Sequence, residues 1–428
     1  MKKTNDKRFT SHIKTPIEKT HVSHIEKTKH RAQIQLQRQP YSQVESSHLP
    51  SASQYESSDT QTEADTDTLI TSRTTGRGAP SNVTHRFSSE KLEVDGDFYD
   101  GLDEDDKPLL RTEFFNDASK SIVSQNDSPD IGFRYSINFY RGCEHGCIYC
   151  YARPTHEYLN LSAGLDFESK IFVKAKAPEL LREKLNSPKW QPELIVMSGV
   201  TDCYQPAERN FQLARKCLEV LNEFKNPIAI ITKNSLVTRD IDILKELSAA
   251  DCAHVTISVT SLNNDLARRM EPRTSSPAAR LKAIEDLAKA SIPVGVNVAP
   301  VVPGLSDQEI PQILKAAADA GATSASWVPV RLPYSVKDLF AQWLEVHYPE
   351  KKQKVLSAIR DIRGDKLNDS TFGSRMRGEG PYADSINNMF QVFKNKYGLN
   401  KSSRHLTVAN FKRPAPLSEK KPQLSFFD

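Results

Sequence analysis

The chain has 428 residues, a formal net charge of +4, 38% hydrophobic residues and 26% charged residues. This composition excludes a membrane-embedded protein and a uniformly basic nucleic-acid coat, and the length is sufficient for two or three domains. Six cysteines are too few for a disulfide scaffold and are typical of a reducing compartment. Because the sequence shows no secretory signal and no apolar run of about 18 residues, we expect a cytoplasmic protein without membrane contact.

Residues 1–107 are predicted to form a disordered, low-complexity tail. The first 75 residues contain no glycine and no tryptophan and are rich in Ser, Thr and Lys. Such a segment lacks the apolar surface that a core requires. An acidic run from Asp95 to Lys107 closes it, and the repulsion between its charges favours an extended chain.

Beyond Pro108 the pattern changes to short apolar runs that alternate with helical stretches, which is typical of βα units. Six runs are apolar enough to be strands of a parallel sheet covered on both faces. They are Arg134–Phe139, Leu194–Met197, Ile228–Thr232, His254–Val259, Val294–Val298 and Ser324–Val328. Six such strands give a barrel, partial or closed, or an open sheet, and in each case the chemistry lies at the carboxyl ends of the strands.

Two of the intervening helices carry start signals. Ser276 precedes a proline at the first helical position, as an N-cap does. Ser306 and Glu309 have the spacing of a capping box, and Gly321 is expected to end the helix that follows them.

Polar residues follow the predicted strands at their carboxyl ends. Any one of them can simply end a strand and begin a loop, but as a set they indicate a site. The set consists of Ser198, Thr232, Lys233, Ser258, Thr260, Asn297 and Arg331.

The strongest signal is the loop after the first predicted strand, in which Cys143, Cys147 and Cys150 have the spacing C-x3-C-x2-C. Three closely spaced thiolates can bind three corners of a cubane iron–sulfur cluster and leave one iron open for a substrate or cofactor. Two other interpretations are a zinc site completed by His145 or His156, and a buried loop of unligated cysteines.

Five stretches of the chain carry a resemblance to a known family: RGCEHGCIYCYARPTHEYL, SGVTDCYQPAER, ITKNSLVTRDIDIL, SVTSLNNDLARRMEPRTSSPAARL and RMRGEGPYAD. Together they resemble the radical S-adenosylmethionine (radical SAM) superfamily, and more narrowly bacterial members related to spore photoproduct lyase and DNA repair photolyases. The resemblance extends from about Gly76 to about Tyr397. It implies an α/β fold in which residues 108–333 form a partial (β/α)6 TIM-type barrel.

The resemblance also implies the cofactors and the reaction. Cys143, Cys147 and Cys150 are expected to hold a [4Fe–4S] cluster, and S-adenosylmethionine (SAM) is expected to bind its open iron. An electron donor such as flavodoxin or ferredoxin reduces the cluster. SAM is then cleaved to a 5′-deoxyadenosyl radical, which abstracts a hydrogen atom from the substrate.

By the same resemblance, eight residues are expected to contact SAM: Tyr149, Ser198, Gly199, Thr201, Lys233, Ser258, Arg273 and Asn297. Tyr149 is placed near the adenine. Arg273 meets the SAM carboxylate or, alternatively, forms an ion pair at a helix start. Ser198 and Val200 depart from the family's Gly-Gly-Glu segment, and Val294–Asn297 matches its glycine-rich fifth-strand motif only loosely.

The remaining cysteines have separate expectations. Cys203 is a candidate catalytic residue, because a thiol at this place can return a hydrogen atom to a substrate radical as a cysteine does in spore photoproduct lyase. The alternative is a small, partly buried packing side chain. Cys217 and Cys252 are predicted to be core residues.

The C-terminal part of the chain is predicted to form a helical appendage over residues 334–412 and a flexible tail over residues 413–428. The loop Arg375–Tyr382 either holds phosphate or packs the appendage onto the barrel. Gln423–Phe427 resembles the bacterial sliding-clamp-binding peptide, and the alternative is a tail that docks on its own domain.

The sequence leaves three hypotheses for the function of the protein. The leading hypothesis is a radical SAM enzyme that acts on nucleic acid, in DNA repair or modification. The second is a radical SAM enzyme that modifies a protein or a small molecule. The third is a non-catalytic iron–sulfur or zinc protein that serves as a scaffold.

Overall fold

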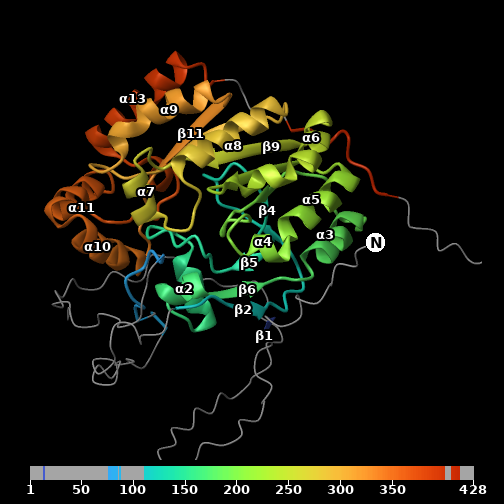
Figure 1. The fold of residues 1–428 in the computed structure, drawn as a ribbon, viewed down its shortest axis with the longest axis horizontal. Helices are drawn as coiled ribbons and strands as arrows, with labels where there is room; N and C mark the ends of the chain where they lie inside the picture. The colour runs from blue at the N-terminus through green and yellow to red at the C-terminus, as the bar shows by residue number, and fades with distance from the viewer. Residues whose placement is uncertain (1–12, 15–75, 85, 88–109, 401–405, 415–428) are drawn as a thin grey trace, which may run out of the picture. The chain divides into compact units, whose positions relative to one another are not determined.

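The computed structural model describes residues 13–14, 76–84, 86–87, 110–400 and 406–414. At its centre lies a seven-stranded sheet with the strand order β11-β10-β9-β8-β7-β4-β3 (Figure 1). Six of these strands are parallel: β4 (Tyr135–Ile137), β7 (Ile195–Met197), β8 (Ile228–Thr232), β9 (Ala253–Ser258), β10 (Val294–Val301) and β11 (Ser324–Pro329). All six predicted strands are therefore confirmed; β8 has the predicted ends, and the other five differ at one or both ends.

The sheet stays open, because β4 and β11 do not pair with each other. The short strand β3 (Val123–Gln125) is antiparallel to β4 and forms one edge, and β11 forms the other. Six parallel strands with helical crossovers and an unclosed sheet confirm the α/β fold with a partial (β/α)6 barrel.

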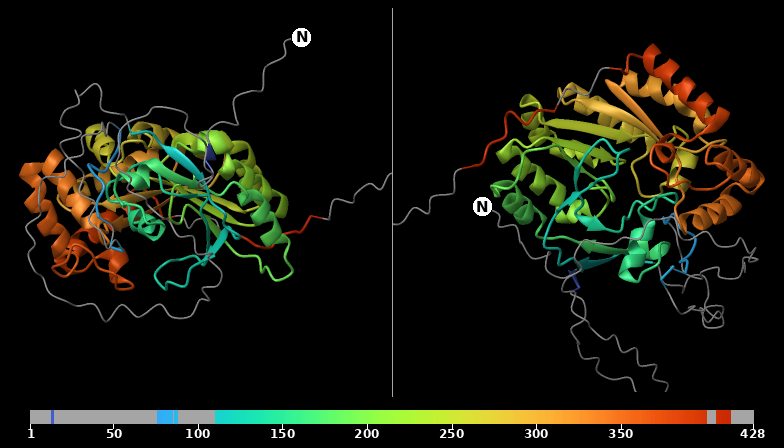
Figure 2. Two further views of the ribbon diagram at one scale, coloured as in Figure 1. Left: turned by 90° about the horizontal axis from the view of Figure 1, so that it is seen from below. Right: turned by 180° about the vertical axis from the view of Figure 1, so that it is seen from behind.

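Helices cover one face of this sheet (Figures 1 and 2). They are α3 (Ala177–Asn186), α5 (Leu213–Phe224), α6 (Ile241–Ala249), α8 (Pro277–Lys289) and α9 (Ile310–Asp319). In α5, Cys217, Leu221 and Phe224 recur every three or four residues and are fully buried. Cys217 is thus a core residue, as predicted. The burial of such an apolar stripe holds each helix against the strands.

The opposite face of the sheet is polar and partly hollow. Strand residues alternate between the two faces, so Val255 and Ile257 of β9 are buried in the core while His254 and Thr256 line a cavity of 270 Å³. Ser326 of β11 lines the same cavity. This inner face corresponds to the interior of the partial barrel.

A second, four-stranded sheet has the order β1-β2-β6-β5. Its strands are β1 (Ile13–Lys14), β2 (Glu113–Asn116), β6 (Lys170–Val173) and β5 (Tyr140–Arg141). Two short helices precede β6, η1 (Arg153–Leu159) and α2 (Leu165–Ser169). The sequence analysis did not predict this sheet. Because β5 lies between β4 and the cysteine loop, the sheet supports that loop from one side.

The C-terminal helices are α10 (Val336–His347), α11 (Lys352–Asp361), α12 (Ser374–Arg377) and α13 (Gly380–Lys396). In α13, Ile386 and Phe390 join the core beneath α9. In α10, Phe340 and Trp343 join a second core that also contains Ile148 of the cysteine loop. Three of these helices, α10, α11 and α13, share a core with elements of the barrel.

The two predicted helix starts have different outcomes. Ser276 caps α8, because its hydroxyl accepts the N–H of Ala279 at 3.3 Å. The capping box of Ser306 and Glu309 is wrong. The Ser306 hydroxyl accepts the Val302 N–H at 3.0 Å, and the Glu309 carboxylate is bound by the loop after β9.

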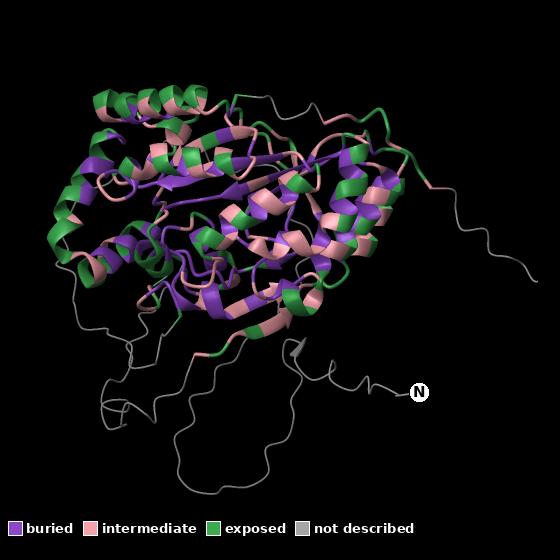
Figure 3. Cartoon of the chain, turned by 45° about the horizontal axis from the view of Figure 1, so that its top comes forward, coloured by how far each residue is buried: buried purple, intermediate pink, exposed green. Residues whose placement is uncertain are grey.

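Most of the predicted N-terminal tail lies outside the described residues. Within it, however, Arg77, Gly78 and Ala79 are buried, and Gly78 packs against Gly146 of the cysteine loop. Figure 3 shows the buried residues of the molecule in purple, including those along the strands of the central sheet. The folded core therefore includes residues that the sequence assigned to the tail. Among the described residues, no helix is both long and apolar enough to cross a membrane.

Candidate metal centre

The three predicted cluster ligands lie on the loop that follows β4 and β5. All three cysteines are free, Cys143 and Cys147 are buried, and Cys150 is half-buried. Burial raises the pKa of all three thiols, and for Cys143 the Asp202 carboxylate and the two other thiols raise the pKa further. A bound cationic cluster supplies the charge that stabilises the thiolate forms.

The spacing of these thiols bears on the kind of metal group they fit. Among the described residues, no three His, Cys, Asp or Glu side chains come close enough to hold one metal ion. A zinc ion needs all its ligands about 2.0–2.3 Å from a common point, whereas a cubane cluster binds each thiolate through a separate iron. Three soft thiols on one loop are the ligand type that iron–sulfur clusters use.

The two histidines proposed as a fourth zinc ligand are engaged elsewhere. The Nδ1 atom of His145 lies 3.5 Å from the Asp202 carboxylate, and its Nε2 atom lies 3.1 Å from the Asn234 amide. The Nε2 atom of His156 lies 2.9 Å from the Lys170 carbonyl oxygen. Both ring nitrogens of His145 are therefore engaged, which weighs against His145 as a zinc ligand, whereas the Nδ1 of His156 is buried without a partner.

Glycine is required at two turns of the cysteine loop. Gly142 and Gly146 have φ values of +84° and +67°, in the left-handed region. A Cβ atom on Gly146 would lie 2.7 Å from the Glu168 carboxylate, and one on Gly78 would lie 1.7 Å from the Gly146 carbonyl oxygen. The loop thus packs against a neighbouring segment that also needs a glycine.

A buried ion pair supports the loop from behind. The Arg153 guanidinium donates to the carbonyl oxygens of Cys147 and Gly146 at 2.9 and 3.1 Å, and it pairs with Glu168. Neither side chain of the pair is exposed. The Glu168 carboxylate also accepts the N–H groups of Gly78 and Ala79 at 2.9 and 2.8 Å. We did not predict this pair, although Arg153 directly follows the cysteine motif.

Tyr149, between the second and third cysteines, belongs to a second buried network. Its hydroxyl donates to Glu271, which pairs with Arg280 and accepts the Thr260 hydroxyl at 2.6 Å. Burial alone would raise the pKa of Glu271, but Arg280, Lys233 and these hydrogen bonds lower it below its ordinary value. The network fixes the Tyr149 ring, and its contact with adenine stays a prediction.

The predicted SAM-contacting segment after β7 is tied to the end of β4. Ser198 has a φ of +75°, the left-handed conformation that favours glycine. The Asn138 side chain accepts the Thr201 N–H at 3.3 Å, and the Gly199 carbonyl accepts the Tyr151 hydroxyl at 2.7 Å. The segment therefore lies beside the residue that follows the last cysteine, and its contact with SAM stays a prediction.

Three further predicted residues lie at the carboxyl ends of the central strands. The Lys233 ammonium is 5.9 Å from the centre of the Tyr149 ring, so the structure brings it to the cysteine loop. Ser258 and Asn297 are register partners on β9 and β10. The Ser258 carbonyl accepts the Arg280 guanidinium at 3.0 Å, which connects this strand end to the Tyr149 network.

Arg273 is engaged within the protein. Its Nε donates to the Gly76 carbonyl at 3.0 Å, and its guanidinium lies 3.6 Å from the Glu144 carboxylate. The ion-pair alternative thus describes its observed contacts, although the partner lies in the cysteine loop rather than at a helix start. A contact with the SAM carboxylate stays a prediction.

Cys203, the candidate hydrogen-atom donor, is 2% exposed and belongs to the main hydrophobic core. Its N–H donates to the Ser198 hydroxyl at 2.8 Å. Burial raises the pKa of its thiol, and the nearby Asp202 carboxylate raises the pKa further. These surroundings are those of a packing side chain, and no contact in the structure tests the catalytic role.

Arg331, which follows β11, belongs to the predicted set of polar residues at strand ends, but the sequence analysis assigned it no role of its own. Arg331 forms no ion pair with any described carboxylate, its Nε is buried without a partner, and its guanidinium lies 5.9 Å from the Tyr151 ring centre. The neighbouring Arg363 donates only to carbonyl oxygens, including that of Val330 at 2.8 Å. Burial and the Arg331 charge lower the pKa of Arg363 to about 10.

The loop Arg375–Tyr382 packs onto the barrel, so the packing alternative is correct for its two ends. Arg375 forms a two-pronged ion pair with Asp130, and this contact lowers the pKa of Asp130 to about 2. The Tyr382 hydroxyl donates to Asp307 at 2.7 Å. The Arg375 guanidinium is therefore occupied by a carboxylate rather than available to a phosphate.

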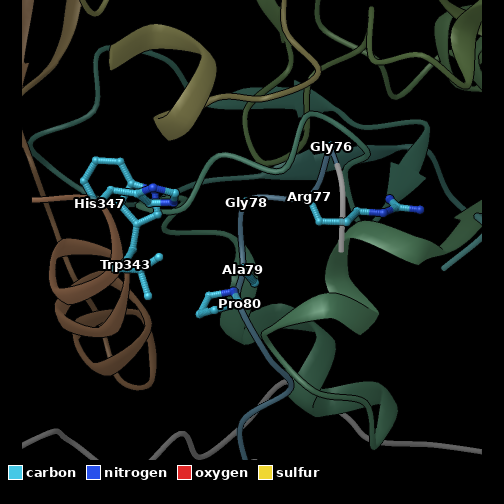
Figure 4. A pocket seen from close by; sticks show the side chains of 8 residues that line it. Gly76, Arg77, Gly78, Ala79, Pro80, Trp343 and His347 are labelled. Atoms are coloured by element: carbon cyan, nitrogen blue, oxygen red, sulfur yellow. The ribbon is translucent and has the colours of Figure 1, made fainter. Parts of the chain in front are cut away.

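A cavity of 340 Å³ lies between the Gly76–Pro80 segment and α10 (Figure 4). Trp343 and His347 of α10 line one side, and the Arg77 side chain points away from the cavity (Figure 4). None of the predicted site residues lines it. We therefore do not include it in the candidate centre.

Comparison with known proteins gives a match to the family model of the radical SAM superfamily over residues 137–317. An uncharacterized protein of Mycobacterium tuberculosis is 37% identical over 222 residues, 51% of this chain and 65% of that protein, so the match spans less than two thirds of that relative. An uncharacterized protein of Methanocaldococcus jannaschii is 32% identical over 199 residues, 46% of this chain and 71% of that protein.

Among solved structures, spore photoproduct lyase complexed with dinucleoside spore photoproduct aligns with a TM-score of 0.49 and 17% sequence identity. The alignment covers 67% of this chain and 79% of the lyase chain.

Proposed function

Because this chain belongs to the radical SAM superfamily, we propose that it is an enzyme that reductively cleaves SAM at a cluster held by Cys143, Cys147 and Cys150. The superfamily uses a [4Fe–4S] cluster and SAM, and these are the cofactors of this chain. When bound, they supply the electron and the 5′-deoxyadenosyl radical for hydrogen-atom abstraction. The observation that supports the ligand assignment is the set of three free thiols, two buried and one half-buried, on one loop that turns at two glycines.

The chain's own residues orient this centre. Arg153 and Glu168 hold the loop backbone from behind, and Glu271 fixes the Tyr149 ring at its side. Because these groups are buried, they place no flexible or solvent-exposed surface next to the thiols.

Anaerobic reconstitution tests the ligand assignment. We expect about four irons per wild-type chain and formation of 5′-deoxyadenosine when SAM and dithionite are added. Cys143→Ala, Cys147→Ala and Cys150→Ala should each lose both properties. Cys252→Ser is the matched control, because this cysteine lies before β9 and bonds only backbone carbonyls there. A full iron load in all three loop variants would refute the assignment.

We further propose that the substrate is nucleic acid, as in DNA repair or modification. The supporting observation is the Arg331 guanidinium just beyond β11, which forms no ion pair with a described carboxylate and has Arg363 beside it. A guanidinium without an ion-pair partner near the reaction centre suits a polyanionic substrate. The alternative substrate, a protein or small molecule, does not require it.

Substrate-dependent turnover distinguishes these options. Damaged duplex DNA, undamaged duplex DNA and single-stranded DNA are added to the reconstituted enzyme, and 5′-deoxyadenosine is measured over time. Stimulation by DNA that weakens in Arg331→Met but not in Arg182→Met, an exposed residue of α3, supports a nucleic-acid substrate. Basal SAM cleavage without stimulation by any DNA favours a protein or small-molecule substrate. A full cluster without any 5′-deoxyadenosine supports the scaffold alternative.

Partners and location complete the proposal. A flavodoxin or ferredoxin is expected to reduce the cluster, and the cytoplasm remains the predicted location. Gln423–Phe427, outside the described residues, is proposed to bind the sliding clamp. Deletion of residues 423–428 should abolish clamp retention in a pull-down with the full chain as control. Unchanged retention would eliminate the clamp proposal.

A further inference from the structure

Four residues from three separate segments form an exposed aromatic cluster, which we call the aromatic platform: Arg86, Phe87, Tyr158 and Tyr334. The Arg86 guanidinium lies 3.8 Å from the centre of the Tyr334 ring, 4.9 Å from that of Phe87 and 5.4 Å from that of Tyr158. The Phe87 and Tyr158 rings are also 5.4 Å apart. The platform therefore gathers three rings around one cation.

The rings of the platform are unusually open to solvent. Phe87, Tyr158 and Tyr334 are 55%, 69% and 60% exposed. Single exposed aromatic residues need no explanation, but a contiguous group of large rings marks a surface that binds something. Among the described residues, the other exposed aromatic side chains are Tyr151 and Phe372. The exposed rings are thus concentrated in a few places.

The platform is held in place from below. Arg86 forms an ion pair with Glu157 at 2.7 Å, and the Glu157 side chain is 1% exposed. Glu157 also accepts the Ser335 hydroxyl at 3.0 Å. Because the Arg86 charge is already balanced, the guanidinium mainly orders the rings around it. Tyr334 has a φ of +51°, a backbone conformation that is rare for a bulky residue and that accumulates at functional sites.

The platform also lies beside the candidate centre along the chain. Tyr158 is on η1, which begins three residues after Cys150. Tyr334 follows β11 and is three residues after Arg331, the unpaired cation. Two of the rings therefore come from segments that directly follow the cysteine loop and the strand end that carries Arg331.

We propose that the aromatic platform binds unpaired nucleobases of the substrate by stacking. This inference rests on the proposed nucleic-acid function and specifies how the substrate is held. Exposed rings and guanidinium planes stack on any base, and proteins use this combination for single-stranded or extruded nucleotides. A helix of a protein partner would instead require an aliphatic groove, whereas the platform consists of three rings and a cation.

The test is the affinity of the reconstituted, full-length enzyme for a labelled single-stranded oligonucleotide, measured by fluorescence anisotropy at fixed salt. Because one base stacked on an aromatic ring contributes enough to change affinity roughly tenfold, we expect Tyr158→Ala to weaken binding about tenfold and the double variant with Phe87→Ala to weaken it further. Tyr158→Phe keeps the ring and should bind like wild type. Val392→Ala, an exposed residue of α13, is the matched control.

The outcomes separate this inference from the proposed function. Iron content and melting temperature are measured first. A loss of oligonucleotide binding in a variant that is folded and carries the cluster is then due to the removed ring. If DNA stimulates SAM cleavage but the double alanine variant binds as tightly as wild type, the platform is overturned and the function stands. If wild type binds no nucleic acid and none stimulates it, the nucleic-acid function itself fails. Loss of a protein partner with unchanged oligonucleotide binding would also overturn the platform.

Discussion

Arg153 is the residue whose replacement tests most directly how the cysteine loop is held. Arg153→Met keeps the length and apolar character of the side chain but removes the guanidinium. The change breaks the fully buried pair with Glu168 and the bonds to the carbonyl oxygens of Gly146 and Cys147. It leaves the Glu168 carboxylate buried with only two backbone N–H donors, those of Gly78 and Ala79.

The magnitude follows from this geometry. Removing one partner of a buried ion pair costs about 3–5 kcal/mol, because the remaining charge stays desolvated. The whole stability of a domain is about 5–15 kcal/mol, so the loss is a large part of it. An exposed pair contributes only about 0–1 kcal/mol. Arg182, which pairs with Glu223 while both side chains are over 40% exposed, is therefore the matched control.

The assay is urea unfolding of the cluster-free chain, followed by reconstitution and iron analysis. Arg153→Met should unfold at a clearly lower urea concentration than wild type and retain less iron, whereas Arg182→Met should match wild type in both. The double variant Arg153→Met with Glu168→Gln should recover part of the loss, because it removes the unpaired charge. Equal stability and iron content of Arg153→Met and Arg182→Met would refute our account of the loop.

Three further predictions concern other residues. Gly146→Ala should lower iron retention, because Gly146 has a positive φ and a Cβ there would meet the Glu168 carboxylate. Gly132→Ala, which has open space around it, should retain as much iron as wild type, and iron analysis measures both variants. Tyr149→Phe should cost about 1–3 kcal/mol in urea unfolding, because a buried carboxylate loses a donor. Arg375 lowers the pKa of Asp130 to about 2, below its unfolded value of about 3.9. The stability that this ion pair contributes is therefore complete above about pH 3.9 and is lost as the pH falls towards 2. Asp130→Asn should therefore be less stable than wild type at pH 6, with the difference vanishing near pH 2 in acid titrations of the cluster-free chain.

The sequence predicted the parts of the fold that depend on local pattern. The strands β8 and β10 are recognisable because apolar, β-branched residues follow one another between turn signals. The cysteine loop is recognisable because its ligand spacing is local as well. By contrast, β2 and β6 are short, and their pairing joins segments that no short-range pattern connects.

The contacts that the sequence did not reveal join distant positions. Arg375 reaches Asp130 across 245 residues, and Glu168 reaches Gly78 across 90. The capping box failed for the same reason, because the Glu309 side chain is taken by Leu262 and Ser261 of another loop. Residue spacing predicts the local structure of a segment, whereas contacts with distant residues determine which polar groups remain free.

The ties on the cysteine loop have a consequence for how the protein is made. Gly78, which precedes the loop in the sequence, packs against it. Two later residues also bind it: the Ile148 N–H donates to the Met270 carbonyl at 3.0 Å, and the Arg273 N–H donates to the His145 carbonyl at 3.3 Å. We therefore expect the three thiols to reach their final places only after about residue 273 has been synthesised, and cluster insertion to follow that step. A short peptide that contains only the loop lacks the contacts that shape it.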